Sequence, residues 1–219
     1  MKIVVISDVH GRTTWKEIVE KEKNADLFIF LGDYLDSFDI SPESQVHNFR
    51  SIIQFKKENM DKVILLLGNH DCQYHPYILE KCSGFQQKTL FLIQDDFKVW
   101  IDENFFQMCF VYDKYIFSHA GISNTFCKDN ELDIENIEKS INDLYKFKPQ
   151  KFRFNLGRNL SYSGDDVCQT PIWIRPNSLD KDGLEKFIHV VGHTFTPQIT
   201  IHGNIVLTDC NPNKEYLII

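Results

Sequence analysis

The chain has 219 residues, an apolar fraction of 42% and a net charge of −7, which fit one globular domain with a substantial core. No apolar run approaches the roughly 18 residues of a membrane span, and the run Ile3–Ile6 is too short for a secretory signal. We therefore expect a cytoplasmic protein that does not enter membranes, while its oligomeric state is left open. The negative charge argues against sequence-independent nucleic-acid binding, because such binding depends on neutralisation of phosphates by Lys and Arg.

The first part of the chain alternates between short apolar runs and segments with helical patterns. Thr13–Lys23 predicts a helix, and Ser41–Asn59 predicts a second one with Ser41 as its cap and Pro42 at its first position. The apolar runs predict buried strands at Lys2–Ser7, Asp26–Leu31 and Lys62–Leu67. This alternation indicates an α/β fold with a largely parallel start.

The rest of the chain is richer in strand patterns. Gln87–Asn104 and Ile134–Phe147 predict helices, and the polar segment Lys148–Gln169 predicts a loop or lid. The predicted strands are Phe105–Tyr112, Tyr115–Ser118, Ile172–Arg175, His189–Val191, Gln198–His202, Ile205–Thr208 and Tyr216–Ile219, of which the first two form a hairpin. We expect a single domain over residues 1–219, with about 123–170 as a candidate lid or substrate-specificity insertion.

Five of the predicted strands run directly into polar residues and glycine. The motifs are Asp8-Val9-His10-Gly11, Gly32-Asp33-Tyr34-Leu35-Asp36, Gly68-Asn69-His70-Asp71, His119-Ala120-Gly121 and Gly192-His193-Thr194. Ligands of open α/β sheets bind beyond the carboxyl ends of strands, so we expect these motifs to meet at one edge. Asp8 and His10 would face the same way on an extended segment and share one ion. Carboxylate, imidazole and amide oxygen suit Mn, Fe or Zn better than calcium.

Each motif alone also has a common structural explanation. A lone Asp-x-His is a weak metal signal, and Gly-Asp after a strand is often only a turn or helix cap. Gly-His and Gly-Asn-His sequences are frequently structural turns. The metal interpretation rests on the joint occurrence of all five motifs in order, each directly after an apolar run.

This ordered series resembles the calcineurin-like metallophosphoesterase superfamily, and its motifs span residues 8 to 194. The resemblance implies two mixed β-sheets packed as a sandwich flanked by helices, with a dinuclear metal site at the strand ends. It assigns the first metal to Asp8, His10 and Asp33, and the second to Asp33, Asn69, His119 and His193, with Asp33 bridging the two.

One branch of the superfamily fits better than the others. Many members carry Gly-His-x-His, but here the last position is Phe195, so the chain resembles the branch of serine/threonine protein phosphatases and diadenosine-tetraphosphate hydrolases. In that branch the segment Pro171–Arg175 resembles the one that bears a phosphate-binding arginine, although Arg175 could also be a surface charge at a strand end. The usual Asp-Arg-Gly is replaced by Asp-Ser-Phe, which removes a second substrate arginine. Arg12 or Arg158 could replace it, although a solvated surface position is the commoner role.

The chemistry of phosphoester hydrolysis assigns roles to the remaining polar residues. Two divalent transition-metal ions, with Mn expected and Fe or Zn as alternatives, would hold a bridging hydroxide that attacks phosphorus directly. The metals and Arg175 would stabilise charge on the phosphoryl oxygens. His70 is the candidate acid for the leaving oxygen, with Asp36 orienting it, and the alternative is a merely structural turn histidine.

Three functions are compatible with these residues. The first is hydrolysis of a phosphomonoester, such as phosphoserine or phosphothreonine in a phosphoprotein. The second is hydrolysis of a nucleotide or dinucleoside polyphosphate. The third is a non-catalytic protein-binding scaffold, which the intact set of predicted ligands disfavours.

Overall fold

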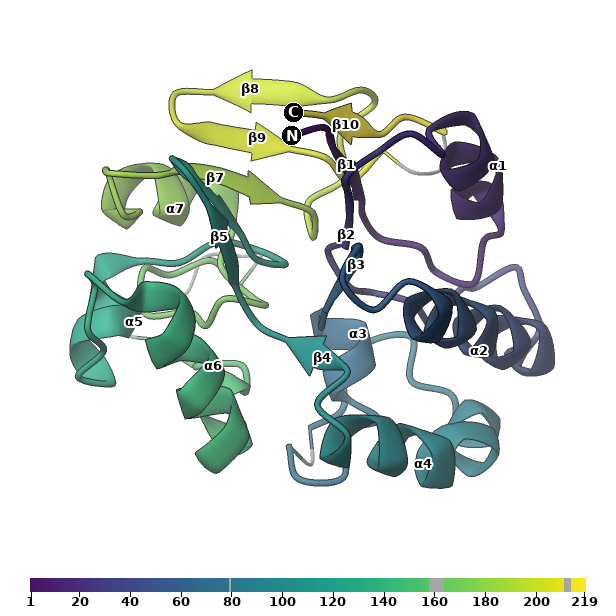
Figure 1. Ribbon diagram of the computed structural model, residues 1–219. Coiled ribbons are helices and arrows are strands. Elements are labelled where there is room, and N and C mark those ends of the chain that lie inside the picture. Colours follow the sequence, from purple (N-terminus) through teal and green to yellow (C-terminus); the bar gives the residue numbers. More distant parts are fainter. Residues whose placement is uncertain (79, 158–163, 211–213) are drawn as a thin grey trace.

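The computed structural model describes residues 1–78, 80–157, 164–210 and 214–219 (Figure 1). The helices are α1 Thr14–Lys21, α2 Pro42–Glu58, α3 Asn69–Cys72, α4 Gln87–Asp102, α5 Asn124–Asp129, α6 Ile137–Phe147, the 3-10 turn η1 Pro149–Phe152, and α7 Pro176–Asp182. The strands are β1 Ile3–Ile6, β2 Leu27–Phe30, β3 Val63–Leu66, β4 Phe106–Gln107, β5 Phe110–Tyr112, β6 Tyr115–Phe117, β7 Ile188–Val191, β8 Thr200–His202, β9 Ile205–Leu207 and β10 Leu217–Ile218. Within these ranges no helix is both long and apolar enough to cross a bilayer.

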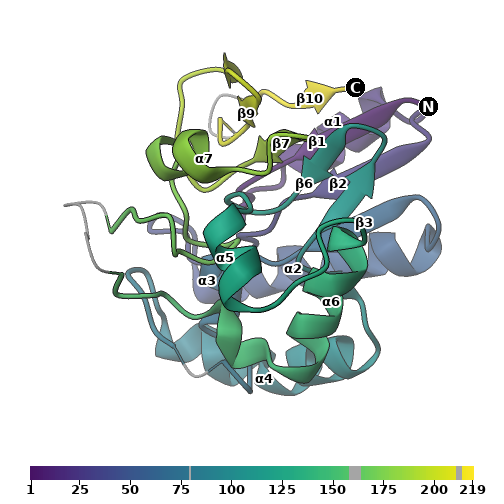
Figure 2. The same ribbon diagram turned by 90° about the vertical axis from the view of Figure 1, so that its left-hand side faces the viewer.

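The strands form two five-stranded mixed sheets. The first has the order β10-β1-β2-β3-β4, with β1 to β4 parallel and β10 antiparallel to β1. The second has the order β5-β6-β7-β9-β8, in which β6, β7 and β9 are parallel and the two outer strands are antiparallel. The sheets lie face to face, with α1, α2 and α4 outside the first and α5, α6 and α7 outside the second (Figures 1 and 2). The predicted sandwich flanked by helices is therefore confirmed.

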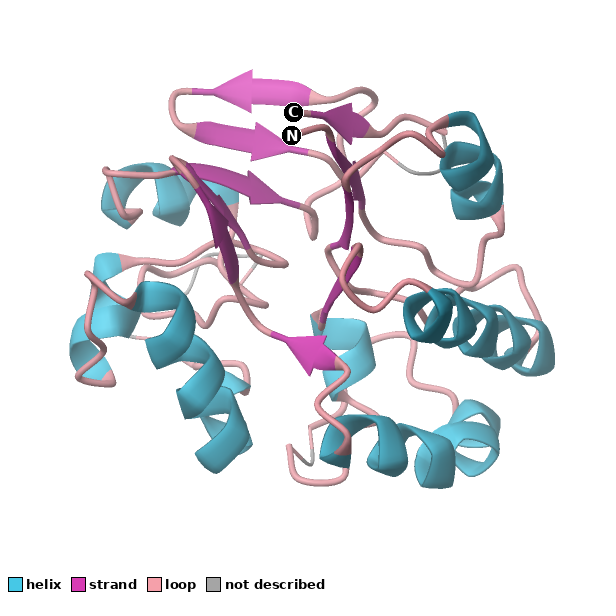
Figure 3. Ribbon diagram, viewed as in Figure 1, coloured by secondary structure: helices cyan, strands magenta, loops and turns pink. Residues whose placement is uncertain are grey.

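The apolar pattern of the first strands explains this layering. Alternate residues of a strand point to opposite faces of the sheet. On β1, Ile3 and Val5 belong to the cluster that fills the space between the sheets, whereas Val4 and Ile6 pack into the larger cluster under the helices. Both faces are covered, so the strands read as continuous apolar runs rather than as alternating ones. Figure 3 shows the result, with the strands inside and the helices outside.

Phe49 of α2 lies at the centre of the larger cluster. Its ring stacks on Tyr34 with centroids 4.6 Å apart and meets Phe97 and Trp100 of α4 edge to face at 5.9 and 5.3 Å. Aromatic pairs in these arrangements add stability beyond the area that they bury. Because Tyr34 also donates a hydrogen bond to the carbonyl of Leu66, this packing fixes the chain directly after β2.

Most predicted elements are confirmed, including Ser41 as the cap of α2, where its hydroxyl accepts the amide of Ser44 at 3.3 Å. The single strand predicted at Phe105–Tyr112 is wrong. It is two strands, β4 in the first sheet and β5 in the second, since the chain crosses between the sheets there.

The strand predicted at Ile172–Arg175 is also wrong. Ile172 and Ile174 are buried alternately, as in a strand, but the amides of Trp173 and Ile174 bond to the carbonyl of Thr170 in a tight turn. Pro176 then begins α7, because proline is tolerated at the first position of a helix. Within the predicted loop Lys148–Gln169 the described residues hold η1 and irregular chain, and residues 158–163 lie outside the described part.

We predict that Phe49→Ala lowers the free energy of unfolding by about 3–5 kcal/mol, because it leaves a cavity among rings that cannot collapse fully. Urea unfolding followed by tryptophan fluorescence measures the change. The control is Phe91→Ala on α4, whose side chain is 68% exposed and which should change stability by less than about 0.5 kcal/mol. Equal losses in the two variants would contradict the central role of Phe49.

Candidate metal centre

The predicted site residues follow the carboxyl ends of strands in both sheets. Asp8 and His10 follow β1, Asp33 and Asp36 follow β2, and Asn69 begins α3 directly after β3. From the second sheet, His119 follows β6 and His193 follows β7. Since the strands involved are parallel within each sheet, their ends meet at a common edge.

The side chains of this group lie close together. Ligand atoms of Asp8, Asp33 and His119 all lie within 4.8 Å of one another, and these three could hold a metal ion. The Oδ1 atom of Asn69 is 3.0 Å from Nε2 of His119 and 3.0 Å from Nδ1 of His193. His10 reaches the group through its Nε2 atom, which is 3.7 Å from Oδ2 of Asp33.

The hydrogen bonds of His10 and His119 determine which nitrogen of each ring faces Asp33. In each ring Nδ1–H donates to a main-chain carbonyl at 2.8 Å, that of Leu35 for His10 and that of Leu31 for His119. Each Nε2 therefore presents a lone pair toward Asp33. Nε2 of His119 thus faces Asp33 Oδ2 at 3.4 Å and an amide oxygen at 3.0 Å, so that three electron-pair donors converge. A cation between them would turn this repulsion into coordination, so the residues fit a divalent metal.

The backbone of the centre is held in an uncommon conformation. Among the described residues nine that are not glycine have positive φ, and five of them belong to this site. They are Asp8, His10, Asp33, Asp36 and His193, with φ between 42° and 68°. Each such residue costs on the order of 1–3 kcal/mol and persists only where the surroundings enforce it. The expectation that Asp8 and His10 share an extended segment is therefore wrong, because both turn into the left-handed region as β1 ends.

Two glycines make room for the carboxylates. A Cβ atom on Gly68 would collide with Oδ1 of Asp33, and one on Gly192 would collide with Oδ2 of Asp8. The amide of His193 bonds to both oxygens of Asp8, at 3.0 and 3.3 Å. The Asp8 carboxylate thus lies directly against the main chain of the second sheet.

Burial and neighbouring charges shift the pKa values of the histidines and aspartates in the centre. Burial lowers the pKa of His10, His119 and His193, which favours the neutral form that metals bind. Burial raises the pKa of Asp33, but the surrounding imidazoles outweigh it and bring the value down to about 2. The pKa of Asp8 is raised by burial and then by Asp209 and Asp33. Bound cations would relieve this carboxylate repulsion.

His70 and Asp36 form a pair beside the centre. Nδ1–H of His70 donates to Oδ2 of Asp36 at 3.0 Å, and the amide of His70 donates to Oδ1 of Asp33 at 3.0 Å. Gln73 and Tyr74 also donate to the Asp36 carboxylate, which is fully buried. The His70 ring lies edge-on to the His10 ring, with centroids 5.1 Å apart. His70 is thus next to the ligands without being among them.

The opening of the site is a pocket of about 410 Å³. It is lined by Asp8, His10, Arg12, Asp36, Ser37, Phe38, Asp39, His70, Phe195 and Asp209. The guanidinium of Arg12 pairs with Asp39 at 3.3 Å. Nη1 of Arg175 donates to the hydroxyl of Thr194 at 3.3 Å, beside His193. Arg158, the other candidate for a second substrate cation, lies outside the described residues.

Comparison with known proteins decides the family. A family model described as calcineurin-like phosphoesterase matches residues 1–207. The chain belongs to this family. A search of curated proteins found no match.

Solved structures with a similar fold include other phosphoesterases. A protein serine/threonine phosphatase from Saccharomyces cerevisiae, similar to human phosphatase PP5, aligns over 94% of this chain with a TM-score of 0.51 and 12% identity. This chain covers 66% of that phosphatase, just under two thirds of its length. The phosphoesterase Yfce from E. coli aligns over 94% of this chain and 77% of its own, with 13% identity and a TM-score of 0.36. At these identities the first alignment supports the shared fold alone.

Sequence reasoning assigned no role to two acidic residues that lie at the candidate centre. Asp71 accepts three main-chain amides, from Asp33 at 2.7 Å, Gly68 at 2.9 Å and Tyr34 at 2.8 Å. Asp209 follows the end of β9 and lines the pocket, and burial raises its pKa to about 7. The strand-end rule that found the other residues would have found Asp209 as well.

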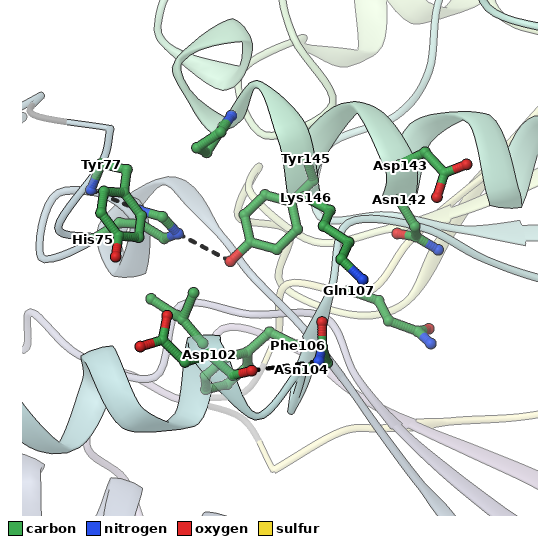
Figure 4. Close-up of a pocket in the computed structure, with 12 residues that line it drawn as sticks. His75, Tyr77, Asp102, Asn104, Phe106, Gln107, Asn142, Asp143, Tyr145 and Lys146 are labelled. Carbon is green, nitrogen blue, oxygen red and sulfur yellow. Dashed lines mark hydrogen bonds between the residues drawn. The ribbon is translucent and has the colours of Figure 1, made fainter.

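A second pocket of the structure, of about 540 Å³, lies between α4, β4 and α6 (Figure 4). In it His75 and the hydroxyl of Tyr145 are hydrogen bonded at 3.0 Å. None of the predicted metal ligands lines it, and burial lowers the pKa of His75 to about 4. Among the described residues, the group that could hold a metal ion is Asp8, Asp33 and His119, which lies at the strand ends and not in this larger pocket.

We predict that Asp71→Asn destabilises the protein by about 1–3 kcal/mol, because an amide group can no longer accept all three N–H groups. The loops carrying Asp33 and Gly68 should loosen, so metal binding should weaken as well. Thermal unfolding with and without added manganese measures both effects. Asp95→Asn on the exposed face of α4 is the matched control. A variant with unchanged stability and metal affinity would show that Asp71 does not hold these loops.

Proposed function

We propose that the chain is a dinuclear metal-dependent phosphoesterase that hydrolyses a phosphomonoester without a covalent phosphoenzyme. The observation that carries the proposal is the placement of a histidine–carboxylate pair directly beside six convergent ligand residues. The intact ligand set, which comprises Asp8, His10, Asp33, Asn69, His119 and His193, argues against a non-catalytic scaffold.

The proposed metals would share Asp33. Asp8, His10 and Asp33 would hold the first metal, and Asp33 would hold the second together with Asn69, His119 and His193, which are in mutual contact through the amide oxygen of Asn69. Manganese is the proposed metal, with iron or zinc as alternatives, because the donors mix carboxylate, imidazole and amide oxygen. Bound divalent metals supply a hydroxide nucleophile near neutral pH and stabilise charge on phosphoryl oxygens.

His70 is the proposed general acid. Burial lowers the pKa of His70, but the charges of Asp33 and Asp36 and the hydrogen bond to Asp36 outweigh burial and raise the pKa to about 9. A raised pKa favours the protonated ring that a general acid requires. Nδ1–H is held by Asp36, which leaves Nε2–H free to protonate the leaving oxygen.

Arg175 is the proposed phosphate-binding residue. Its side chain bonds to Thr194, and its amide donates to Oδ1 of Asp165 at 3.0 Å, which fixes the start of α7. A guanidinium can bind two phosphate oxygens at once. Arg12, on the opposite side near His10, is the proposed second cation in place of the missing arginine.

Hydrolysis of a nucleotide or dinucleoside polyphosphate is the second candidate function. The proposed ligands and acid serve this reaction equally well. The pocket walls favour it in one respect, because Phe38 and Phe195 offer aromatic surface beyond the phosphate position. Phosphoprotein hydrolysis draws support from the similarity in fold to a serine/threonine phosphatase.

We predict that Asp33→Asn abolishes activity and lowers metal content together, since one neutral oxygen cannot bridge two cations. Metal analysis of protein incubated with manganese gives the content, and p-nitrophenyl phosphate gives the rate. Chelation of wild-type protein should reproduce the loss, and added manganese should reverse it. Asp95→Asn should leave both values unchanged. Full activity in Asp33→Asn, or activity that survives chelation, would disprove the metal mechanism.

We predict that His70→Asn keeps its metals and loses more rate on phosphoserine than on p-nitrophenyl phosphate. An alkoxide leaving group needs a proton, whereas nitrophenolate is stable without one. General acids contribute about 10²–10⁴-fold, so the loss on phosphoserine should fall in this range. Asp36→Asn should show the same pattern more weakly, since it removes only the orienting charge.

The measurement is kcat/KM for each variant on both substrates, with metal content determined in parallel. His47→Asn, an exposed histidine on α2, controls for loss of an imidazole elsewhere. If both substrates slow by the same factor while chemistry limits the rate, His70 binds or positions phosphate instead of protonating the leaving group.

A further inference from the structure

Two phenylalanine side chains at the mouth of the active-site pocket stand in solvent. Phe38 is 86% exposed and Phe195 is 58% exposed. Both line the same pocket as Asp8, His10 and His70. Single exposed apolar residues are common on protein surfaces, but two phenyl rings on one polar pocket form a local apolar surface where a ligand must pass.

Phe38 and Phe195 each lie in a turn that also carries a residue of the candidate site. Phe38 follows Asp36 by two residues and Phe195 follows His193 by two, and both of those site residues have positive φ. The turns that carry Asp36 and His193 therefore also fix the backbone from which the two phenyl rings extend. The carbonyl of Ser37, between Asp36 and Phe38, accepts hydrogen bonds from Gln45 at 3.3 Å and Gln86 at 2.9 Å. These two hydrogen bonds hold the backbone of the turn that carries Phe38 in place.

The charges around the rings favour a neutral occupant. The positive charge of Arg12 is balanced by Asp39, and the pairing of Asp36 with His70 leaves Asp209 as a further acidic side chain that lines the pocket. A chain of further phosphates or an acidic peptide would meet the carboxylates of Asp39 and Asp209, whereas an uncharged group would not be repelled by them. A phenyl face offers no hydrogen bond and binds flat aromatic groups by offset or edge-to-face stacking.

We propose that Phe38 and Phe195 form an aromatic entrance that binds a neutral planar ring on the alcohol side of the substrate. The phosphate lies at the metal ligands, so the rings at the mouth contact the group esterified to it. The substrate class is a phosphomonoester whose alcohol carries an aromatic ring, and nucleoside monophosphates and phosphotyrosine both offer this chemistry. This inference rests on the proposed phosphomonoesterase function.

Matched substrate pairs test the entrance. Adenosine 5′-monophosphate and ribose 5-phosphate share the 5′ ester linkage and differ in the base, and phosphotyrosine and phosphoserine form the second pair. The wild-type enzyme should show the lower KM for the ring-bearing member of at least one pair, and KM is compared because kcat for phosphotyrosine also reflects its better leaving group. Base–aromatic stacking is strong enough that Phe38→Ala or Phe195→Ala should raise KM for this substrate on the order of ten-fold, with kcat little changed. The ring-free partner should be affected much less.

Two further variants separate stacking from other effects. Phe38→Leu keeps apolar surface without a ring and should lose most of the preference. Phe91→Ala removes a phenyl ring on α4 that is 68% exposed and does not line the pocket, and should change neither constant. Circular dichroism and metal content check that each variant is folded and loaded.

Each outcome of these experiments either supports or contradicts the proposed entrance. A loss confined to the nucleotide identifies the ring as a base, and a loss confined to phosphotyrosine identifies it as the tyrosyl ring; both support the entrance. Equal losses on ring-bearing and ring-free substrates, or a wild-type enzyme without preference in either pair, would overturn it while leaving the phosphomonoesterase function intact. If no phosphomonoester is hydrolysed by metal-loaded protein, the proposed function itself fails, and the entrance fails with it.

Discussion

The contacts of the buried Asp33 carboxylate hold the rest of the centre together. One oxygen accepts the amide of His70 at 3.0 Å, and the other lies 3.7 Å from His10 and 3.4 Å from His119. These contacts join residues of the first sheet to a histidine of the second. Buried carboxylates require compensation; here the main-chain amide of His70 supplies part of it, and a cation between Asp33 and the imidazoles would supply the rest. The site therefore exists only where both sheets are correctly packed.

The strained turns at the strand ends are held by hydrogen bonds from main-chain amides to buried carboxylates. Asp71 ties the turn after β2 to the turn after β3, through the amides of Asp33 and Gly68. The Asp8 carboxylate does the same across the two sheets by accepting the amide of His193. Left-handed conformations of aspartate and histidine persist because these bonds would be lost on relaxation. The geometry of the candidate centre is thus maintained by main-chain amides that bond to buried carboxylates.

The apolar runs predicted most of the strands, whereas the sandwich of two sheets was predicted from the resemblance to a known family, and the structure brings the predicted site residues together. Buried parallel strands require continuous apolar runs, and the abrupt change to polar residues marks where each strand reaches the edge of its sheet. The same logic failed at Ile172–Arg175, where alternating burial arises in a turn that bonds to Thr170. It also failed at Phe105–Tyr112, because a change of sheet leaves no mark in an apolar run. The role of Asp71 depends on amides brought from distant turns, which local patterns do not show.

The pairing of β10 with β1 has a consequence for how the protein is made. Val4 lies opposite Ile218, so a strand near the start of the chain waits for a partner more than two hundred residues later. Until that partner emerges during synthesis, one side of β1 presents unpaired amides and carbonyls beside an apolar surface. Such edges are prone to pair with other chains, and long-range pairings form slowly. The first sheet therefore cannot be completed until the segment that carries β10 has been synthesised.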